Sequence, residues 1–254
     1  MRTWMQILTM SLAVAALSAC DDGSGPAGTA PVSLSFLTGT GSGSPALAAV
    51  TLTDGAGNAL EIESVEVVLR DIEFQRTEAV ANCEELAGED DCEEINVGPD
   101  VASLPLDATM PVVTFQANVP VGSFRRIDFE VHKLDDGDPK DAALIALRPD
   151  FDDISILVSG TWTPVDGSAT PFTFASDLNE RQRILLATPL VLVEGEAKNV
   201  TFVVDLDGWF RDGSGNLIDP ATANKGGLNE NLVKDNVRGS IEGFEDNNGD
   251  GVED

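Results

Sequence analysis

The feature that most constrains this chain is a series of short segments in which apolar and polar residues alternate, separated by Gly, Pro, Asp and Asn. Near the start, Val32, Leu34 and Phe36 alternate with serines. A period of two is typical of a strand with one buried face. Similar segments and short apolar runs predict strands near 46–53, 65–69, 112–120, 124–134, 143–148, 154–162, 169–175, 183–188, 190–194 and 199–206. We therefore expect an all-β, antiparallel, Greek-key-like β-sandwich, with no helix long enough for a crossover between 32 and 225.

Two details of this pattern have consequences for the sheet. The alternation slips by one residue at Arg70 and Asp71, which predicts a β-bulge or a strand end. The turn residues at 120–123 lie between two alternating segments, and they predict a β-hairpin over 112–134. Asp128, Glu130 and His132 alternate with apolar residues in its second strand. We expect these three side chains on the solvated face.

The last part of the chain has a different periodicity. Val233, Val237, Ile241 and Phe244 recur at helical spacing and predict one amphipathic C-terminal helix over 229–244, docked on the sheet. Gly239 and Gly243 lie within this range and weaken a helix, at a cost of up to about 1 kcal/mol each relative to alanine.

The first residues predict export and lipidation. Arg2, an apolar run over 7–17 and the small residues before Cys20 have the pattern of a secretory signal, and the run is shorter than the roughly 20 residues that a spanning helix needs. Leu17-Ser18-Ala19-Cys20 resembles the lipobox of bacterial lipoproteins. That resemblance implies cleavage after Ala19 and acylation of Cys20. We thus divide the chain into a signal (1–19), a lipidated cysteine with a flexible Gly/Pro/Ser tether (20–31), one sandwich domain with the helix (32–245) and an acidic tail (246–254).

The net charge of the chain limits the kinds of partner that it can bind. Without residues 1–19, which hold one basic residue, the chain has 14 basic and 44 acidic residues, a formal charge of −30. This charge excludes nucleic acid and repels anionic lipid surfaces. Attachment to the membrane therefore depends on the acyl chains, which contribute about 0.8 kcal/mol per buried CH₂. The acidic surface is consistent with solubility after export or with a specific role in binding cations.

Cysteine use fits an oxidising compartment. Besides Cys20, the chain has Cys83 and Cys92, which bracket the segment CEELAGEDDC. In an exported protein this pair predicts a disulfide, worth on the order of 2–3 kcal/mol for so short a loop. A zinc site is the alternative, although two cysteines fall short of its four ligands.

A calcium site is the sharpest local hypothesis. Asp246-Asn247-Asn248-Gly249-Asp250-Gly251-Val252 resembles the first half of an EF-hand loop. Asp246, Asn248 and Asp250 match positions one, three and five, and Val252 would offer its carbonyl at position seven. The glutamate of position twelve would be residue 257, beyond Asp254. The other interpretation is a solvated acidic tail.

Two repeated turns have a simpler interpretation. Asp54-Gly55-Ala56-Gly57-Asn58 and Asp212-Gly213-Ser214-Gly215-Asn216 share the pattern D-G-x-G-N. Their side chains are suited to binding local backbone, so we predict turns, with cation sites as the alternative. The acids at 135–138 and 150–153 are interpreted as loop residues.

The sequence offers little support for catalysis. His132 is the only histidine, and no G-x-S-x-G elbow or similar nucleophile motif is present. A glycosidase-type carboxylate pair remains the alternative, because 44 acidic residues form many pairs. Trp162 and Trp209 are the two tryptophans after the signal, and Trp209 is expected to close the core rather than to stack on sugars.

A second resemblance covers residues 32–207. The lipobox, the Gly-rich tether, Gly122-Ser123-Phe124-Arg125-Arg126-Ile127 and the acidic end of Val203-Val204-Asp205-Leu206-Asp207 resemble an uncharacterised all-β domain of bacterial lipoproteins. This resemblance implies a fold and a location but no catalytic residues. We expect a non-enzymatic, membrane-anchored, extracytoplasmic binding or structural module with an envelope protein or polysaccharide partner. The competing hypothesis is a cell-envelope hydrolase with a carboxylate pair.

Overall fold

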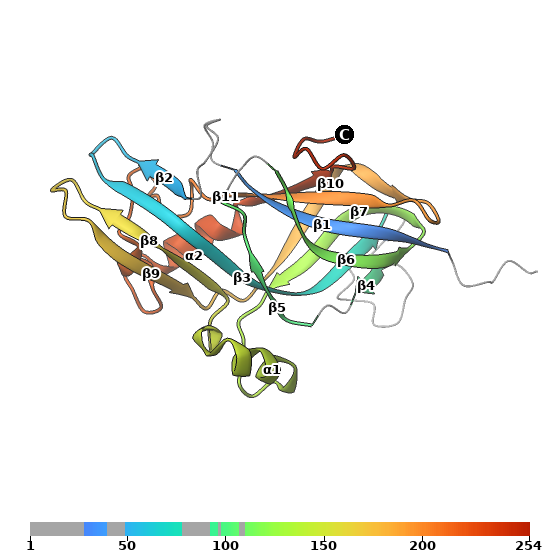
Figure 1. Cartoon of the computed structure of the whole chain (residues 1–254), viewed down its shortest axis with the longest axis horizontal. Coiled ribbons are helices and arrows are strands. Elements are labelled where there is room, and N and C mark those ends of the chain that lie inside the picture. Colours follow the sequence, from blue (N-terminus) through green and yellow to red (C-terminus); the bar gives the residue numbers. More distant parts are fainter. Residues whose placement is uncertain (1–27, 40–48, 78–91, 96–97, 107–109) are drawn as a thin grey trace, which may run out of the picture.

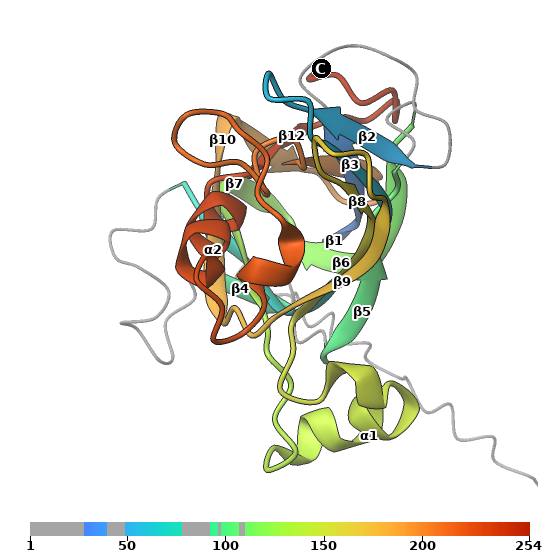
Figure 2. The same ribbon diagram turned by 90° about the vertical axis from the view of Figure 1, so that its left-hand side faces the viewer.

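The computed structural model describes residues 28–39, 49–77, 92–95, 98–106 and 110–254, and of 92–95 only the backbone. It contains two β-sheets packed face to face, with one helix against the sandwich and a second in a lobe that projects from it (Figures 1 and 2). The four-stranded sheet has the order β12-β11-β1-β6, and consists of β12 (Ile241–Glu245), β11 (Lys198–Asp205), β1 (Thr29–Gly39) and β6 (Val112–Pro120).

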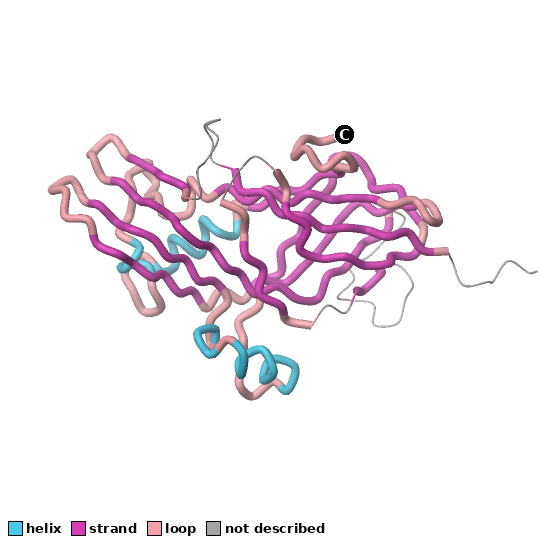
Figure 3. The backbone as a smooth tube through the Cα atoms, viewed as in Figure 1, coloured by secondary structure: helices cyan, strands magenta, loops and turns pink. Residues whose placement is uncertain are grey.

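The eight-stranded sheet is built around β3 (Ala59–Arg76), the longest strand. Its order is β10-β7-β3-β8-β9, and three short strands pair with β3 off this path. The remaining bounds are β2 (Val50–Thr53), β4 (Cys92–Ile95), β5 (Asp100–Ser103), β7 (Gly122–Val131), β8 (Ile156–Thr163), β9 (Thr170–Ser176) and β10 (Glu180–Leu192). The helices are α1 (Pro139–Leu147) and α2 (Glu230–Arg238), with 3₁₀ turns η2 (Pro149–Phe151) and η3 (Pro220–Ala223), as Figure 3 shows.

The predicted β-sandwich is confirmed. The apolar residues that alternate along the strands are buried between the sheets, where the rings of Phe36, Phe129 and Phe202 lie 5.2–6.2 Å apart. Antiparallel pairing holds throughout the described strands except between β1 and β11, which run parallel. The segments predicted at 183–188 and 190–194 form one strand, β10, with a register shift between Leu185 and Leu190.

The irregularity predicted in β3 is also confirmed. The pairing of β3 with β7 shifts between Arg70 and Glu73, and Asp71 has a φ of 50°. Before this bulge Val67 and Leu69 face the main core, and after it the even-numbered Ile72 and Phe74 do so. One extra residue is what such a change of face requires.

The predicted hairpin over 112–134 is wrong. β6 pairs with β1, whereas β7 pairs with β3 and β10 in the other sheet. The tight turn therefore carries the chain from one layer to the other, and the Val121 N–H in this turn donates to the carbonyl of Gly28, just before β1. Both segments have the expected alternation, but alternation identifies a buried face and not the strand that lies alongside.

The strand predicted at 143–148 is also wrong, because this segment lies mostly in α1. The Asp138 side chain caps the helix by accepting a hydrogen bond from the Lys140 N–H, and Pro139 occupies the first turn. Both are start signals of a helix, and the alanines and leucines that follow favour helical structure.

The predicted C-terminal helix is shorter than expected. α2 buries Val233 and Val237 as predicted, but it ends at Arg238, and Ile241–Glu245 form strand β12 against β11. Gly243 lies close to its neighbours: a Cβ there would be 2.7 Å from Ile184 and 2.8 Å from the Phe202 ring. The glycine that breaks the helical pattern is thus the residue that lets β12 approach the core.

The two ends of the predicted domain need correction. Thr29–Pro31, assigned to the tether, belong to β1, where Ala30 is fully buried and pairs with Val119. At the other end, Asp246 is fully buried, so the predicted tail begins inside the fold. The signal segment and Cys20 lie outside the described residues. Within the part of the chain that is described, neither helix combines the length and apolar character needed to cross a bilayer.

Candidate functional site

A small second core lies on the outer face of the eight-stranded sheet. Its buried residues are Val68, Leu134 and Phe151, whereas the neighbours Val67 and Leu69 belong to the core between the sheets. The cover of this second core is the segment 133–155, which includes α1 and η2 and which we call the α1 lobe. Figure 2 shows the lobe standing out from the sandwich.

His132 lies at the junction between the sheet and this lobe, and its predicted exposure is wrong. The residue is 5% exposed, and Asp128 on the same strand is 1% exposed. Alternation correctly places both side chains on the face opposite the main core. That face is covered, however: α1 brings Asp141 against His132, and Arg126 holds Asp128 through two hydrogen bonds of 2.7 and 2.9 Å.

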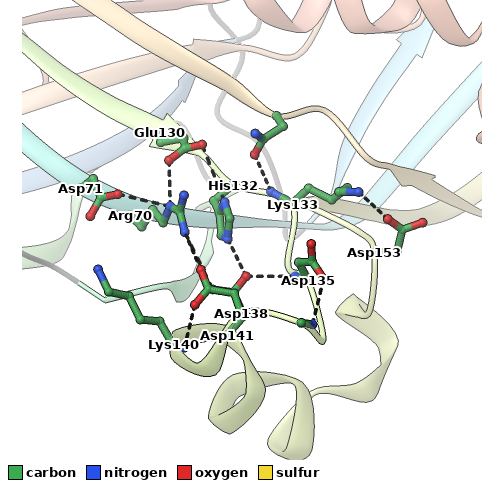
Figure 4. A network of polar contacts seen from close by, with 12 residues as sticks. Arg70, Asp71, Glu130, His132, Lys133, Asp135, Asp138, Lys140, Asp141 and Asp153 are labelled. Carbon is green, nitrogen blue, oxygen red and sulfur yellow. Dashed lines mark hydrogen bonds and ion pairs between the residues drawn. The ribbon is translucent and has the colours of Figure 1, made fainter. Parts of the chain in front are cut away.

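A network of charged groups joins the lobe to the sheet (Figure 4). His132 Nε2 lies 2.7 Å from Asp141 Oδ2, an oxygen that also accepts a 2.9 Å hydrogen bond from the Asp135 N–H. On the other side of the ring, His132 Nδ1 lies 3.7 Å from Glu130 Oε1, too far for a hydrogen bond but close enough for an ion pair. Asp141 is fully buried in the first turn of α1.

Arg70 supplies the second cation. Its Nε donates to Glu130 Oε2 at 2.7 Å and lies 3.2 Å from Asp71. Its Nη1 points to the lobe, 3.6 Å from Asp138 and 3.9 Å from Asp141 Oδ1. We call Arg70, Glu130, His132, Asp138 and Asp141 the His132 network.

The pKa values follow from this arrangement. Burial opposes the charged form of His132, but the carboxylates of Glu130 and Asp141 outweigh that effect, so the pKa of the imidazole is raised. The pKa of Glu130 falls to about 2, because His132 and then Arg70 stabilise the carboxylate against the cost of partial burial. Both ring nitrogens of His132 face carboxylates, an arrangement that favours the protonated imidazole over the neutral one.

A second set of ion pairs surrounds the lobe nearer the solvent. Arg148 donates to both oxygens of Glu66 at 3.0 and 2.9 Å, and its guanidinium lies 4.7 Å from the centre of the Phe151 ring. Asp150 accepts from the same Arg148, and Asp153 accepts from Lys133 at 2.6 Å. Asp152 and Asp153 thus lie in a loop, as predicted, whereas Asp150 lies in η2, and both Asp150 and Asp153 form ion pairs.

The C-terminal loop is folded, with Asp246 buried and with Asn248 and Asp250 exposed at the surface. Asp246 Oδ2 accepts from the Thr201 hydroxyl at 2.8 Å and from the Gly251 N–H at 3.0 Å. Asp246 Oδ1 and Asn248 Oδ1 both accept from the Asp250 N–H, at 3.0 and 2.9 Å, so these two oxygens converge. Asp250 Oδ1 in turn accepts from the Val252 N–H. The loop brings together all four residues that the sequence suggested for calcium, with hydrogen bonds of its own.

The two D-G-x-G-N segments are turns, as predicted. In each, the aspartate accepts from backbone N–H groups two and four residues later, and from the side-chain amide of the asparagine. The turns lie side by side, because Asp54 also accepts from the Leu217 N–H at 2.9 Å and Arg211 donates to the Thr53 carbonyl. These bonds, chiefly that of Asn58, lower the pKa of Asp54 to about 2.

The structure says less about the other predicted sites, which are the cysteine pair and the two tryptophans. Cys83 lies outside the described residues, and of Cys92 only the backbone is described, paired with Gln75 at the start of β4. The disulfide stays a prediction. Trp162 and Trp209 are 9% and 1% exposed, which confirms Trp209 as a core residue and leaves neither ring open to a sugar. Among the described residues, no three His, Cys, Asp or Glu side chains are grouped to hold a metal ion.

Two cavities bear on binding. The space between the sheets next to Phe36, Val131 and Trp209 is apolar and measures about 20 Å³, room for no more than a water molecule. A more open groove of about 350 Å³ lies between β10 and β12, where it is lined by Ile184, Leu185, Ala187, Ile241, Phe244 and charged residues at its rim. The sandwich is thus filled rather than hollow at this point.

The sequence reasoning missed the His132 network and the lobe that completes it. One local signal was available, since Asp138 before Pro139 is a typical helix start and would have placed Asp141 in a first turn. The position of Arg70 beside Glu130 depends on strand pairing between β3 and β7 and has no local signal.

Comparisons with known proteins add little. No protein-family model matches the chain, and no curated protein matches it. Among solved structures the chain is similar to MbnP from Methylosinus trichosporium, with 15% sequence identity and a TM-score of 0.35, over 72% of this chain and 79% of that one. A likeness at this level supports no transfer of function.

Proposed function

We propose that this protein is a lipid-anchored, extracytoplasmic module of the cell envelope that acts by binding or by a structural role, not by catalysis. The observation that carries the non-catalytic part is the state of its buried carboxylates. Asp128 is bound by Arg126, Asp141 by His132, and Asp246 by Thr201 and backbone N–H groups. A hydrolase needs a carboxyl group that can release and take up a proton beside a substrate.

The alternative is a hydrolase that uses a carboxylate pair, and Glu130 and Asp141 are the pair to consider because both lie against His132. The pKa of Glu130 is about 2, which suits a permanent anion rather than a general acid at neutral pH. Neither residue lines the inter-sheet cavity or the groove between β10 and β12. These features favour a structural role for the pair.

Attachment by acyl chains rests on the sequence. The formal charge of −30 after removal of residues 1–19 disfavours adsorption to anionic lipid, so Cys20 would supply the attachment. In cells that produce the full chain, we expect Cys20→Ser to move the protein from the membrane fraction to the soluble fraction. Mass spectrometry of the wild type should find acyl groups on Cys20. Unmodified wild-type protein in the soluble fraction would contradict the anchor.

A direct assay separates the binding module from the hydrolase. The purified protein is incubated with isolated envelope polysaccharide, and both co-sedimentation and new reducing ends are measured. The hydrolase hypothesis predicts new reducing ends that are lost in Asp141→Asn. Our proposal predicts none, and Lys133→Gln, a change at the same junction outside the buried pair, serves as the matched control.

Calcium stabilisation is a second candidate function for the C-terminal loop. It is favoured by the convergence of the Asp246 and Asn248 oxygens on one N–H group, because oxygens so placed are preorganised for a hard cation. We expect calcium to raise the melting temperature of the protein relative to a chelator, since a ligand of the native state stabilises it.

Asp250→Ala should abolish the calcium effect, because it removes an exposed ligand oxygen and leaves the buried Asp246 in place. Asp212→Ala, in a turn that shares the local hydrogen bonding but is not proposed to bind calcium, is the control and should keep the effect. Equal melting temperatures of the wild type with calcium and with chelator would reject calcium binding.

A further inference from the structure

We propose that the His132 network is a protonation-dependent latch that holds the α1 lobe against the outer face of the eight-stranded sheet, closed when His132 is protonated and released as the pH rises. This inference goes beyond the proposed function and does not depend on the lipid anchor or on calcium. It rests on the geometry of the junction, on the burial of the groups and on the balance of their charges.

The network spans the boundary between the two parts. Arg70 belongs to β3, and Glu130 and His132 belong to β7 and its end, so all three move with the sheet. Asp138 and Asp141 belong to the start of α1. The contact of His132 with Asp141 therefore joins the sheet to the lobe, and so do the contacts of Arg70 with both aspartates (Figure 4).

The charged groups around His132 and Arg70 come from three elements, with Glu130 and Asp141 beside the imidazole and the other carboxylates beside Arg70. β7 contributes Glu130, β3 contributes Arg70 and Asp71, and α1 contributes Asp138 and Asp141. With His132 protonated, two cations oppose four carboxylates. With His132 neutral, Arg70 alone opposes them, and less of the repulsion among the carboxylates is offset by attraction to a cation.

Burial makes this change costly at Asp141 in particular. Asp141 is fully buried, and within the described residues neither His132 Nδ1 nor Asp141 Oδ1 has a hydrogen-bond partner. Each of these two atoms is stabilised only by a nearby opposite charge. His132 Nδ1 lies 3.7 Å from Glu130, and Asp141 Oδ1 lies 3.9 Å from Arg70. A buried charge that loses its partner destabilises the state that buries it. For Asp141, that state is the docked lobe.

The sign of the pH dependence follows from linkage. The docked state raises the pKa of His132, and the part of this effect that comes from Asp141 is lost when the lobe leaves, so the docked state binds the proton more tightly than the undocked state does. The stabilisation is complete below the pKa that His132 has in the undocked state and is lost as the pH rises through the raised pKa of the docked state. The lobe is thus docked more firmly when the pH lies below the pKa of His132 than when it lies above it.

Release would have a defined structural result. The buried second core consists of Val68 on the sheet with Leu134 and Phe151 on the lobe, and Val101 and Leu157 pack against it from β5 and β8. Opening the lobe would expose Val68, Val101 and Leu157 as an apolar patch on the outer face of the sheet. Exposure of this apolar patch would therefore depend on whether His132 carries a proton.

The chain is suited to a direct test, because His132 is its only histidine. In the untagged full-length protein, NMR titration of the imidazole reports the protonation of this residue alone. We expect a midpoint above 6.5. A midpoint at or below 6.5 overturns the proposal, and this measurement needs no substitution.

The second measurement follows docking itself. Hydrogen-exchange protection factors, which are corrected for the intrinsic effect of pH, are measured from pH 6 to pH 9 for the α1 amides and for β8. We expect α1 protection to fall as His132 loses its proton, by about tenfold for each unit by which its pKa in the docked state exceeds its pKa in the undocked state. β8 should show no fall of this kind.

Two variants identify the group responsible. His132→Gln can still donate to Asp141 but cannot be charged, so α1 protection should be low and independent of pH. Lys133→Gln removes the neighbouring cation, whose partner Asp153 is half-exposed, and should keep the pH dependence. A fall in α1 protection that persists in His132→Gln, or that disappears in Lys133→Gln, would overturn the latch.

Discussion

The two apolar cores of this protein lie on opposite faces of one sheet, and different forces hold them closed. The core between the sheets is large and is closed by aromatic rings such as Phe36 and Phe202. The second core buries three side chains under the α1 lobe and is ringed by charged groups, among them Arg70, His132 and Arg148. Each fully buried apolar side chain contributes on the order of 1.5–3 kcal/mol, so the second core, with three such side chains, contributes far less by apolar burial than the first.

This difference predicts different sensitivities. Burial of apolar surface is insensitive to pH, and the first core should resist changes of pH and salt. Ion pairs depend on protonation and, where they are exposed, on salt. The second core should therefore be the part of the molecule that responds to solution conditions.

The largest effect is expected from a cavity in the first core. Phe202 is 1% exposed and contacts two other rings, so Phe202→Ala should lower the free energy of unfolding by about 3–5 kcal/mol. Denaturant unfolding measures this loss, and Leu228→Ala, at a residue that is 93% exposed, should change it by less than about 0.5 kcal/mol. A similar loss in both variants would mean that the two sheets are not held by this core.

The same kind of cavity in the second core should act locally. Phe151 is fully buried, and Phe151→Ala should weaken docking of the lobe by about 3 kcal/mol, a fall of roughly 100-fold in the protection of the α1 amides. Global stability should fall less, because a lobe that is already open has no more contacts to lose. The comparison of cores fails if β8 amides lose as much protection as α1 amides do.

The first core could largely be predicted from the sequence, and the second could not. Alternation of apolar residues predicts most strands and even the bulge at Arg70 and Asp71, because a strand with one buried face has an apolar residue at every second position. It could not show that β6 and β7 belong to different sheets, since pairing is decided by residues far away in the chain. The parallel pairing of β1 with β11 is of the same kind.

The candidate site escaped prediction for a related reason. His132 was correctly placed on the polar face of its strand, but exposure depends on what covers that face. The cover is α1, whose run of alanines and leucines predicts a strand although Asp138 and Pro139 mark a helix start. When α1 is not predicted, the position of Asp141 relative to His132 cannot be predicted either. The His132 network is therefore missed.

The smallest effect is expected at the solvated rim of the second core. Glu66 and Arg148 form a bidentate pair whose side chains are 27% and 31% exposed, so Glu66→Gln should weaken docking of the lobe by about 0.5–1 kcal/mol. The loss should shrink in 1 M salt, where the Debye length is about 3 Å and the pair is screened even in the wild type. The protection of α1 amides at low and high salt measures both.

Arg238→Gln breaks an exposed ion pair with Glu180, far from the lobe in sequence, and is the matched control. It should leave α1 protection unchanged at either salt concentration. If Glu66→Gln cost as much in 1 M salt as in dilute buffer, the rim would act through packing of Arg148 on Phe151 and not through charge. The contrast between an apolar core and a charge-held core would then apply only to the buried His132 network.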